Sequence, residues 1–201
     1  MASLPDVVNT VAELDELLSR PSEGLVRFMK TLDGDLMILG AGGKIGPTMA
    51  RMAKRAVDAA GVRKTIYAVD VTDLAALAAE GIKTQKCDML DLAAVEKLPK
   101  VKNIIFMVGR KFGSTGNEWL TWAINVVVPY HVARSFPEAR LAVFSTGCVY
   151  PVTHVVTGGS TEDVPADPVG EYAMSCLGRE RMFDYLSNTQ GEKVVQIRLN
   201  Y

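Results

Sequence analysis

The sequence predicts an α/β fold in which helices cover both faces of a parallel, doubly wound sheet. From residue 35 onward, short apolar runs alternate with segments whose apolar residues follow a helical period. The apolar runs are β-branched or wholly apolar, which is typical of strands buried on both faces. Six such runs occur, and strand–helix alternation of this length indicates a doubly wound domain.

The predicted elements follow one another in a regular order. Strands are expected at 36–39, 65–69, in a short run before Cys87, and at 103–108, 140–145 and 193–199. Helices are expected at 47–60, 73–80, 92–98, 117–136 and 171–188. Gly61 and Gly81 follow the first two helices, where glycine readily ends a helix. The proline-containing segment 150–170 is expected to form a surface loop near a site.

The first 33 residues form a region of their own. Val11, Leu14, Leu17 and Leu18 recur at helical spacing, and Pro21 ends the run. The sequence therefore predicts a helical leader at 1–33 and one main domain at 34–201. Acidic residues come early and no basic-then-apolar order is present, so a secretory signal is not expected.

The charge balance excludes some partners. Lys plus Arg number 22 and Asp plus Glu number 23, which gives a net charge of −1. Binding to nucleic acid or to an anionic membrane needs a basic face, so neither partner is expected. No apolar stretch approaches the length of a membrane-spanning helix, so none is predicted.

The cysteines and histidines predict no metal site. Cys87, Cys148 and Cys176 show no CxxC spacing, and His131 and His154 are the two histidines. Structural zinc needs four clustered ligands, so none is expected. A sparse, odd cysteine count is typical of a reducing compartment, and we expect a cytoplasmic protein.

A glycine-rich turn joins the first expected strand to the first helix. Gly40, Gly43 and Gly46 have the spacing G-x-x-G-x-x-G. Backbone N–H groups at a helix N-terminus bind phosphate, and glycines let the phosphate approach. A P-loop is excluded because no Gly-Lys-Ser/Thr ends the motif. The turn therefore predicts a dinucleotide site, with a tight loop that binds nothing as the alternative.

Acidic residues follow the next two strands. An acid at the position of Asp70 accepts hydrogen bonds from a ribose and repels a 2′-phosphate, which favours NAD over NADP. Lys44, in the glycine turn, has the opposite effect. The alternative for Asp70 is a solvated strand end. Asp88 is expected to contact the adenine, with a helix cap as its alternative.

Two further segments carry hydroxyl groups to the same edge of the sheet. The fifth strand ends in Ser145-Thr146-Gly147-Cys148-Val149-Tyr150, and Tyr172 opens the helix at 171–188. With the glycine turn, these segments resemble the extended short-chain dehydrogenase/reductase family, which contains NAD-dependent nucleotide-sugar epimerases and dehydratases. The resemblance covers residues 35 to 201. It implies a Rossmann fold, NAD as cofactor and a nucleotide sugar as substrate.

The resemblance also implies residue roles. The catalytic hydroxyl falls on Thr146, and the acid/base phenol falls on Tyr172, while a hydride moves to or from the nicotinamide. The implied cofactor contacts are Gly40, Gly43, Lys44, Ile45, Gly46, Asp70, Asp88, Met89, Val108, Gly109, Asn125 and Tyr172.

Position 176 departs from the family pattern. The family places a lysine four residues after the tyrosine, where its charge lowers the pKa of the phenol; this chain has Cys176. A thiol carries no positive charge, so Tyr172 is expected to be a weaker base. Cys176 is interpreted as a small filler at the lysine position in the catalytic site. Arg179, two turns after Tyr172, is expected to be an ordinary surface or salt-bridge residue.

The helix at 117–136 carries two further features. Pro129 has no N–H, so the carbonyl of Asn125 loses its helical partner and either holds a water or marks a simple kink. A broad apolar stripe runs from Trp119 to Ala133. The resemblance implies a homodimer through helices 117–136 and 171–188. Burial within the same chain is the alternative.

Members of the family continue well beyond the strand at 193–199. Arg198 matches a family arginine, but Asn200 comes one residue early. The resemblance implies that most of the C-terminal substrate domain is absent from these 201 residues, and the alternative is a compact form with a different pocket. Three hypotheses follow: an NAD-dependent epimerase/dehydratase-type oxidoreductase, a non-catalytic dinucleotide-binding sensor, and a dimerisation module that binds no nucleotide.

Overall fold

The computed structural model describes residues 4–200, which divide into two compact units. The first unit comprises Met1–Cys87 and Val101–Met107. Its helices are α1 (Val11–Leu18), α2 (Glu23–Thr31), α3 (Gly46–Ala60) and α4 (Ala75–Ala79). Its strands are β1 (Leu36–Leu39), β2 (Ile66–Asp70), β3 (Lys83–Lys86) and β4 (Asn103–Phe106).

Strand β1 lies at the centre of the first unit. It pairs in parallel with β2 on one side and with β4 on the other, so that Leu36 lies opposite both Ile66 and Asn103. All four residues of β1 are buried. Because all the strands run in parallel, the glycine turn after β1 and Asp70 at the end of β2 meet at the same edge of the sheet.

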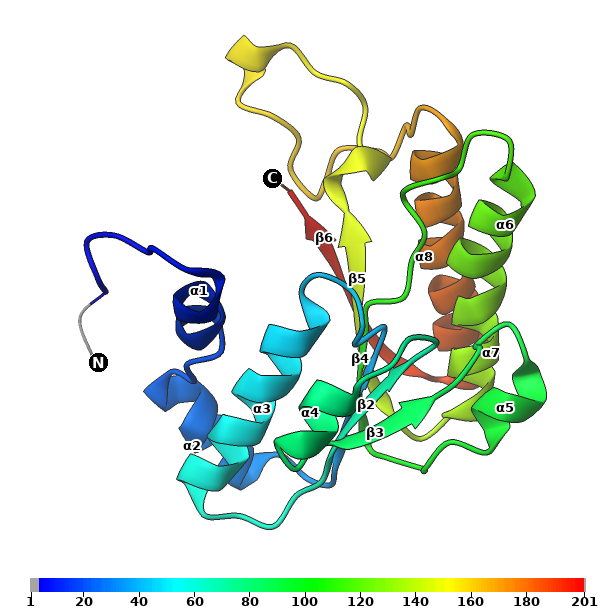
Figure 1. Cartoon of the computed structure of the whole chain (residues 1–201). Coiled ribbons are helices and arrows are strands. Elements are labelled where there is room, and N and C mark those ends of the chain that lie inside the picture. The colour runs from blue at the N-terminus through cyan, green and yellow to red at the C-terminus, as the bar shows by residue number, and fades with distance from the viewer. Residues whose placement is uncertain (1–3, 201) are drawn as a thin grey trace. The chain divides into compact units, whose positions relative to one another are not determined.

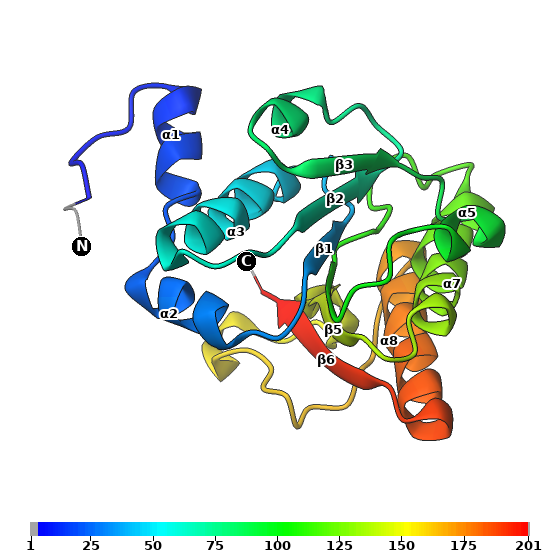
Figure 2. The same cartoon turned by 90° about the horizontal axis from the view of Figure 1, so that it is seen from below.

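The leader forms the helices α1 and α2, which pack against α3 (Figures 1 and 2). Met29 of α2 is 3% exposed and belongs to the apolar core of this unit. Arg51 of α3 forms ion pairs with Asp15 of α1 and with Glu80. These contacts join the leader to the helix that follows the glycine turn.

The second unit comprises Asp88–Lys100 and Val108–Tyr201. Its helices are α5 (Leu92–Glu96), α6 (Glu118–Trp122), α7 (Val128–Ser135) and α8 (Glu171–Gln190). A π-helical segment, Ala123–Val127, joins α6 to α7. Its strands are β5 (Arg140–Thr146) and β6 (Lys193–Leu199), which pair in parallel. The segment between residues 151 and 169 extends away from the helices (Figure 1).

The strand order β3-β2-β1-β4-β5-β6 confirms the predicted parallel, doubly wound sheet. The expectation that all six strands are buried on both faces is wrong for β3 and β6. Both residues at the ends of β3 are exposed lysines, and β6 exposes Val195 and Ile197. Strands at the edge of a sheet lack a neighbour on one side and are covered less completely.

Two boundaries differ from the prediction in a way that affects the site. The strand predicted at 103–108 ends at Phe106, so Val108 and Gly109 lie in the loop that follows β4. The helix predicted at 117–136 is interrupted by the π-helical segment. Within residues 4–200, no helix combines the length and the apolar character needed to cross a bilayer.

Candidate functional site

The glycine turn in the first unit is shaped by close backbone contacts. Gly40 has a φ of +85°, a conformation that side chains disfavour. A Cβ atom on Gly46 would lie 2.3 Å from the carbonyl oxygen of Ala41, so only glycine lets α3 begin this close to the turn. A Cβ atom on Gly42 would lie 2.1 Å from the Thr72 hydroxyl. Gly42 is therefore a third required glycine, which the motif spacing did not identify.

The outer part of the turn is open. Gly43, Lys44 and Ile45 are exposed, and a Cβ atom on Gly43 would meet its nearest neighbour, the Gly40 carbonyl oxygen, at 3.4 Å. In the described part of the chain, no group accepts from the backbone N–H groups of Lys44 and Ile45. Unpaired N–H groups at the start of a 15-residue helix attract an anion. The turn therefore has the shape and the donors that a diphosphate requires.

Asp70 holds the turn in place. Its Oδ2 atom accepts from the Gly42 N–H at 2.9 Å, and its Oδ1 atom accepts from the N–H and the hydroxyl of Thr72, each at 3.0 Å. The residue is only 9% exposed, so the solvated strand end considered above is excluded. A carboxylate has about four acceptor positions, so three bonds leave one for a ribose hydroxyl.

Asp88 and Met89 open the second unit. The Oδ1 atom of Asp88 accepts from the N–H of Leu90 at 3.0 Å, which makes a turn. Asp91, not Asp88, caps α5, so the helix-cap alternative for Asp88 is wrong. Asp88 itself is exposed, whereas Met89 is buried and its carbonyl oxygen lies 3.0 Å from Nδ1 of His131.

Asn125 lies at the centre of a buried polar network in the second unit. It is fully buried, and its Oδ1 atom accepts from the Arg110 N–H at 2.8 Å and from Arg179 Nη2 at 3.0 Å. Its Nδ2 atom donates to the Arg110 carbonyl at 3.1 Å and to Ser175 Oγ at 2.9 Å. The helix is interrupted here by the π-helical segment Ala123–Val127, close to Pro129, which has no N–H with which to continue the α-helical pattern.

The expectation for Arg179 is wrong. It is 5% exposed, and its guanidinium donates to the Phe144 carbonyl at 2.8 Å as well as to Asn125. A Cβ atom on Gly109 would lie 2.5 Å from Arg179 Nη2, so a side chain at 109 would displace this arginine. The spacing of two helical turns from Tyr172 was the available signal, since it places Arg179 on the same face of α8.

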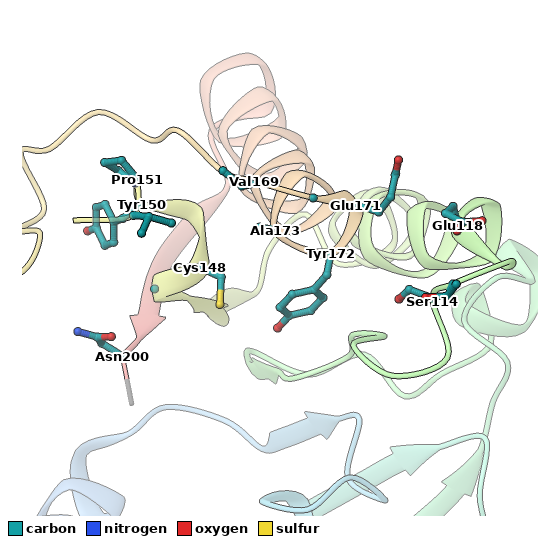
Figure 3. A pocket seen from close by; sticks show the side chains of 14 residues that line it. Ser114, Glu118, Cys148, Tyr150, Pro151, Val169, Glu171, Tyr172, Ala173 and Asn200 are labelled. Carbon is teal, nitrogen blue, oxygen red and sulfur yellow. The ribbon is translucent and has the colours of Figure 1, made fainter. Parts of the chain in front are cut away.

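Tyr172 lines a cavity of about 630 Å³ in the second unit (Figure 3). It is half-buried at the first turn of α8. In Figure 3 its hydroxyl points into the space that Cys148 and Ser114 also border. The cavity is lined by Ser114, Thr115, Glu118, Gly147, Cys148, Tyr150, Pro151, Val152, Val169, Gly170, Glu171, Tyr172, Ala173 and Asn200.

Thr146 lies beneath this lining rather than in it. It is 3% exposed, and its Oγ1 atom accepts from the Cys148 N–H at 3.2 Å, which caps the short turn Gly147–Val149. This bond uses an acceptor position of the hydroxyl and leaves its proton available for donation.

Cys176 cannot provide the charge that its position suggests. The residue is fully buried, and burial raises the pKa of its thiol, although the Arg179 charge and a hydrogen bond with the Tyr172 side chain oppose that rise. The thiol is therefore neutral near pH 7, which argues against a nucleophile. Cys148, in contrast, is exposed.

An ion pair that the sequence did not reveal lies on the inner side of α8. Glu180 is 2% exposed and accepts two hydrogen bonds from Arg198, at 3.1 and 2.8 Å, and one from the Ser145 hydroxyl at 2.5 Å. The Arg198 guanidinium also lies 4.7 Å from the centre of the Tyr150 ring. An arginine between the apolar residues Ile197 and Leu199 was the signal that an acid lies nearby.

Val108, another expected cofactor contact, has no distinctive interaction with the described residues. Val108 is half-buried in the loop after β4, and a second hollow in the first unit adjoins the turn at Asp70. In residues 4–200, no group of three or more His, Cys, Asp or Glu side chains is placed to hold a metal ion.

Comparison with known proteins supports the fold. No protein-family model matches the sequence, and no curated protein matches it significantly. Solved structures do match. A dTDP-glucose 4,6-dehydratase from Streptomyces venezuelae with NAD and TYD bound has a TM-score of 0.73 at 20% identity, covering 82% of this chain and 55% of that one.

Two further structures are similar. A UDP-glucuronic acid 4-epimerase from Bacillus cereus in complex with NAD has a TM-score of 0.68 at 15% identity, covering 82% of this chain and 55% of that one. MoeE5 in complex with UDP-glucose and NAD has a TM-score of 0.67 at 18% identity, covering 81% of this chain and 52% of that one. The chain thus spans about half the length of each, and at these identities the likeness establishes its Rossmann-like fold.

Proposed function

We propose that the chain is the cofactor-binding part of an NAD-dependent oxidoreductase of the epimerase/dehydratase type. It would act on a hydroxyl or keto carbon of a sugar-nucleotide-like substrate, with Tyr172 as acid/base and Thr146 as the second hydroxyl. The similar solved structures that hold NAD with UDP-glucose or TYD support this class.

The glycine turn is the observation that supports cofactor binding most strongly. It has an open outer face, N–H groups of Lys44 and Ile45 with no acceptor among the described residues, and a Gly46 that no other residue can replace without displacing backbone. Free N–H groups occur at the start of every helix, but here the glycines leave the space in front of them open. A dinucleotide diphosphate accounts for both features.

Bound NAD would supply the centre that accepts or returns a hydride. Gly43, Lys44 and Ile45 would hold its diphosphate, and the remaining acceptor position of Asp70 would hold its adenosine ribose. On the protein side, Tyr172 would take the proton from a substrate hydroxyl or return it. Thr146 would donate a hydrogen bond to the same oxygen.

Asp70 favours NAD over NADP. Its carboxylate is fixed by Gly42 and Thr72, so it cannot turn away from a 2′-phosphate. Lys44 is exposed, so water and salt screen its charge. The fixed carboxylate should therefore outweigh the lysine.

Titration calorimetry with NAD and with NADP tests the cofactor assignment. We expect NAD to bind at least about tenfold more tightly than NADP, which corresponds to about 1.4 kcal/mol. UDP-glucose and dTDP-glucose are then added while the absorbance of reduced nicotinamide and the products are followed. The proposal would be rejected if neither NAD nor NADP bound to the protein.

A homodimer through helices α6–α7 and α8 is part of the proposal. Trp119, Val127, Met174 and Tyr185 on these helices are more than 40% exposed, which a partner helix pair would cover. Sedimentation equilibrium tests it: Trp119→Ser with Met174→Ser should yield a monomer, whereas Phe28→Ser in the leader should not change the mass.

One observation favours a second function, a dinucleotide-binding sensor without catalysis. Cys176 is buried and neutral where a catalytic phenol needs a neighbouring cation. A sensor would bind NAD yet leave every sugar nucleotide unchanged, and Cys176→Lys would not create turnover. Turnover by the unaltered protein would exclude this function.

A further inference from the structure

The phenol of Tyr172 needs a positive charge that its own helix does not supply directly. A phenol releases its proton near pH 10 in water, so a base that works near neutrality needs a cation close by. Four residues along α8, the side chain is the neutral Cys176. Arg179 follows one turn later, but its guanidinium donates to Asn125 and to the Phe144 carbonyl, on the buried side of the helix.

A cation lies against Tyr172 from another segment. The Nζ atom of Lys111, an exposed residue in the loop between β4 and α6, lies 5.7 Å from the centre of the Tyr172 ring. The same ammonium lies 5.9 Å from the ring of Phe112. Both distances are within the range in which a cation and an aromatic ring attract each other.

The loop that carries Lys111 is anchored to the helix that carries Tyr172. Both the N–H and the carbonyl of Arg110, the preceding residue, hydrogen-bond to the Asn125 side chain. That side chain also donates to Ser175, whose hydroxyl donates to the Tyr172 carbonyl at 2.8 Å. A continuous series of buried and partly buried hydrogen bonds thus ties the backbone next to Lys111 to the backbone of Tyr172.

The titratable groups that line the cavity beside Tyr172 carry no positive charge, and the neighbouring Arg110 directs its Nη2 atom to the Gly113 carbonyl at 2.9 Å. Cys176 is neutral. Glu171 and Glu118 are acids at the rim of the cavity: Glu171 accepts from the Trp122 indole, and Glu118 from the Gly116 N–H at 2.9 Å. Cys148 and Tyr150 border the same cavity and carry no positive charge.

We propose that Lys111 is a positioning residue for Tyr172, which supplies from the β4–α6 loop the positive charge that position 176 lacks. The inference deepens the proposed function, since it concerns the same acid/base. In this arrangement Asn125 anchors the loop that carries Lys111 to the first turn of α8.

The test is a titration of Tyr172 in the full chain without substrate. Tyrosine labelled with carbon-13 at Cζ is followed by NMR against pH, and the Tyr172 signal is the one missing in Tyr172→Phe. Lys111→Met should raise the Tyr172 pKa by about 0.5 to 1 unit at low salt. Lys111→Arg should leave it close to that of the unaltered protein, and high salt should reduce the Lys111→Met shift.

Lys97→Met is the matched control. Lys97 is an exposed lysine that follows α5 and does not line the cavity of Tyr172, and its loss changes the net charge equally. An unchanged Tyr172 pKa in Lys111→Met would overturn the inference, as would an equal shift in Lys97→Met. Backbone amide spectra show that the variants fold. Because no cofactor is added, this result is independent of the NAD titration, and either proposal can fail alone.

Discussion

Arg179 donates a hydrogen bond to the Oδ1 atom of Asn125 at 3.0 Å, which joins the middle of α8 to the π-helical segment between α6 and α7. Both side chains are buried. The bond lies at the centre of the network that positions Tyr172, so its loss should affect both stability and the site.

Replacement of Arg179 by Met should lower the free energy of unfolding by about 2 to 4 kcal/mol. The variant leaves the Phe144 carbonyl without this donor and removes one of the two donors to Asn125 Oδ1, in a region that excludes water. Urea denaturation at pH 7 measures the change. Arg181→Met is the control, because Arg181 is an exposed partner of Asp184 and should cost less than about 1 kcal/mol. Equal losses would contradict this account of the network.

Two glycine substitutions should separate folding from cofactor binding. Gly46→Ala would place a methyl group 2.3 Å from the Ala41 carbonyl oxygen, so the start of α3 must move and the protein should be destabilised by about 2 kcal/mol or more. Gly43→Ala meets its nearest atom at 3.4 Å and should fold normally. It should nevertheless weaken NAD binding about tenfold or more, because the methyl group occupies the open face of the turn.

Thermal unfolding and calorimetry with NAD check this pair. Should Gly43→Ala bind NAD as well as the unaltered protein does, the open face would not be the diphosphate site.

Glu192 predicts a dependence of stability on pH. It is 3% exposed, both of its carboxylate oxygens lack a hydrogen-bond partner among the described residues, and burial raises its pKa to about 7. Between about pH 4.5 and 7 the folded state therefore holds a proton that the unfolded state has released. Stability should fall as the pH rises through this range, and level off above it.

Glu192→Gln keeps the shape and removes the titration. We expect it to abolish that decline and to stabilise the protein at pH 8 by about 1 to 3 kcal/mol. Urea midpoints across this pH range measure the effect, with the exposed Glu138→Gln as the control. A Glu192→Gln profile that still declines between pH 4.5 and 7 would show that another group is responsible.

The three cysteines should react at very different rates. Cys148 is exposed, whereas Cys87 and Cys176 are buried. A thiol reagent should therefore modify one cysteine of the native protein rapidly, and the other two roughly 100-fold more slowly, through opening of the structure. Mass spectrometry after peptide digestion identifies the site, and Cys148→Ser should remove the rapid phase. Rapid modification of Cys176 would show that its burial is wrong.

The sequence predicted the sheet because the alternation of apolar strands and amphipathic helices is strong. The strand at 36–39 and the strand at 193–199 coincide with β1 and β6. Local spacing also identified Gly40, whose positive φ fits a tight turn. These features depend on residues close to one another in the chain.

What the sequence did not reveal depends on contacts between distant residues. The need for Gly42 arises from Thr72, and the burial of Arg179 arises from Asn125 and the end of β5. Glu180 meets Arg198 only because α8 packs against β5 and β6. Residue types and spacing do not show which distant residues come into contact. The sequence therefore predicts an ordinary surface or salt-bridge role for Arg179, which is buried in the structure.

The two edge strands differ in how they would behave toward other molecules. Lysines at both ends of β3 repel the β3 strand of a second molecule. Their charge also keeps the unpaired backbone groups of β3 hydrated. Strand β6 has an exposed lysine at its start, Lys193, but leaves the side chains of Val195 and Ile197 uncovered. In concentrated or mildly denaturing solutions, self-association should therefore begin at β6, and a lysine at 195 would be the simplest way to keep the purified protein dispersed.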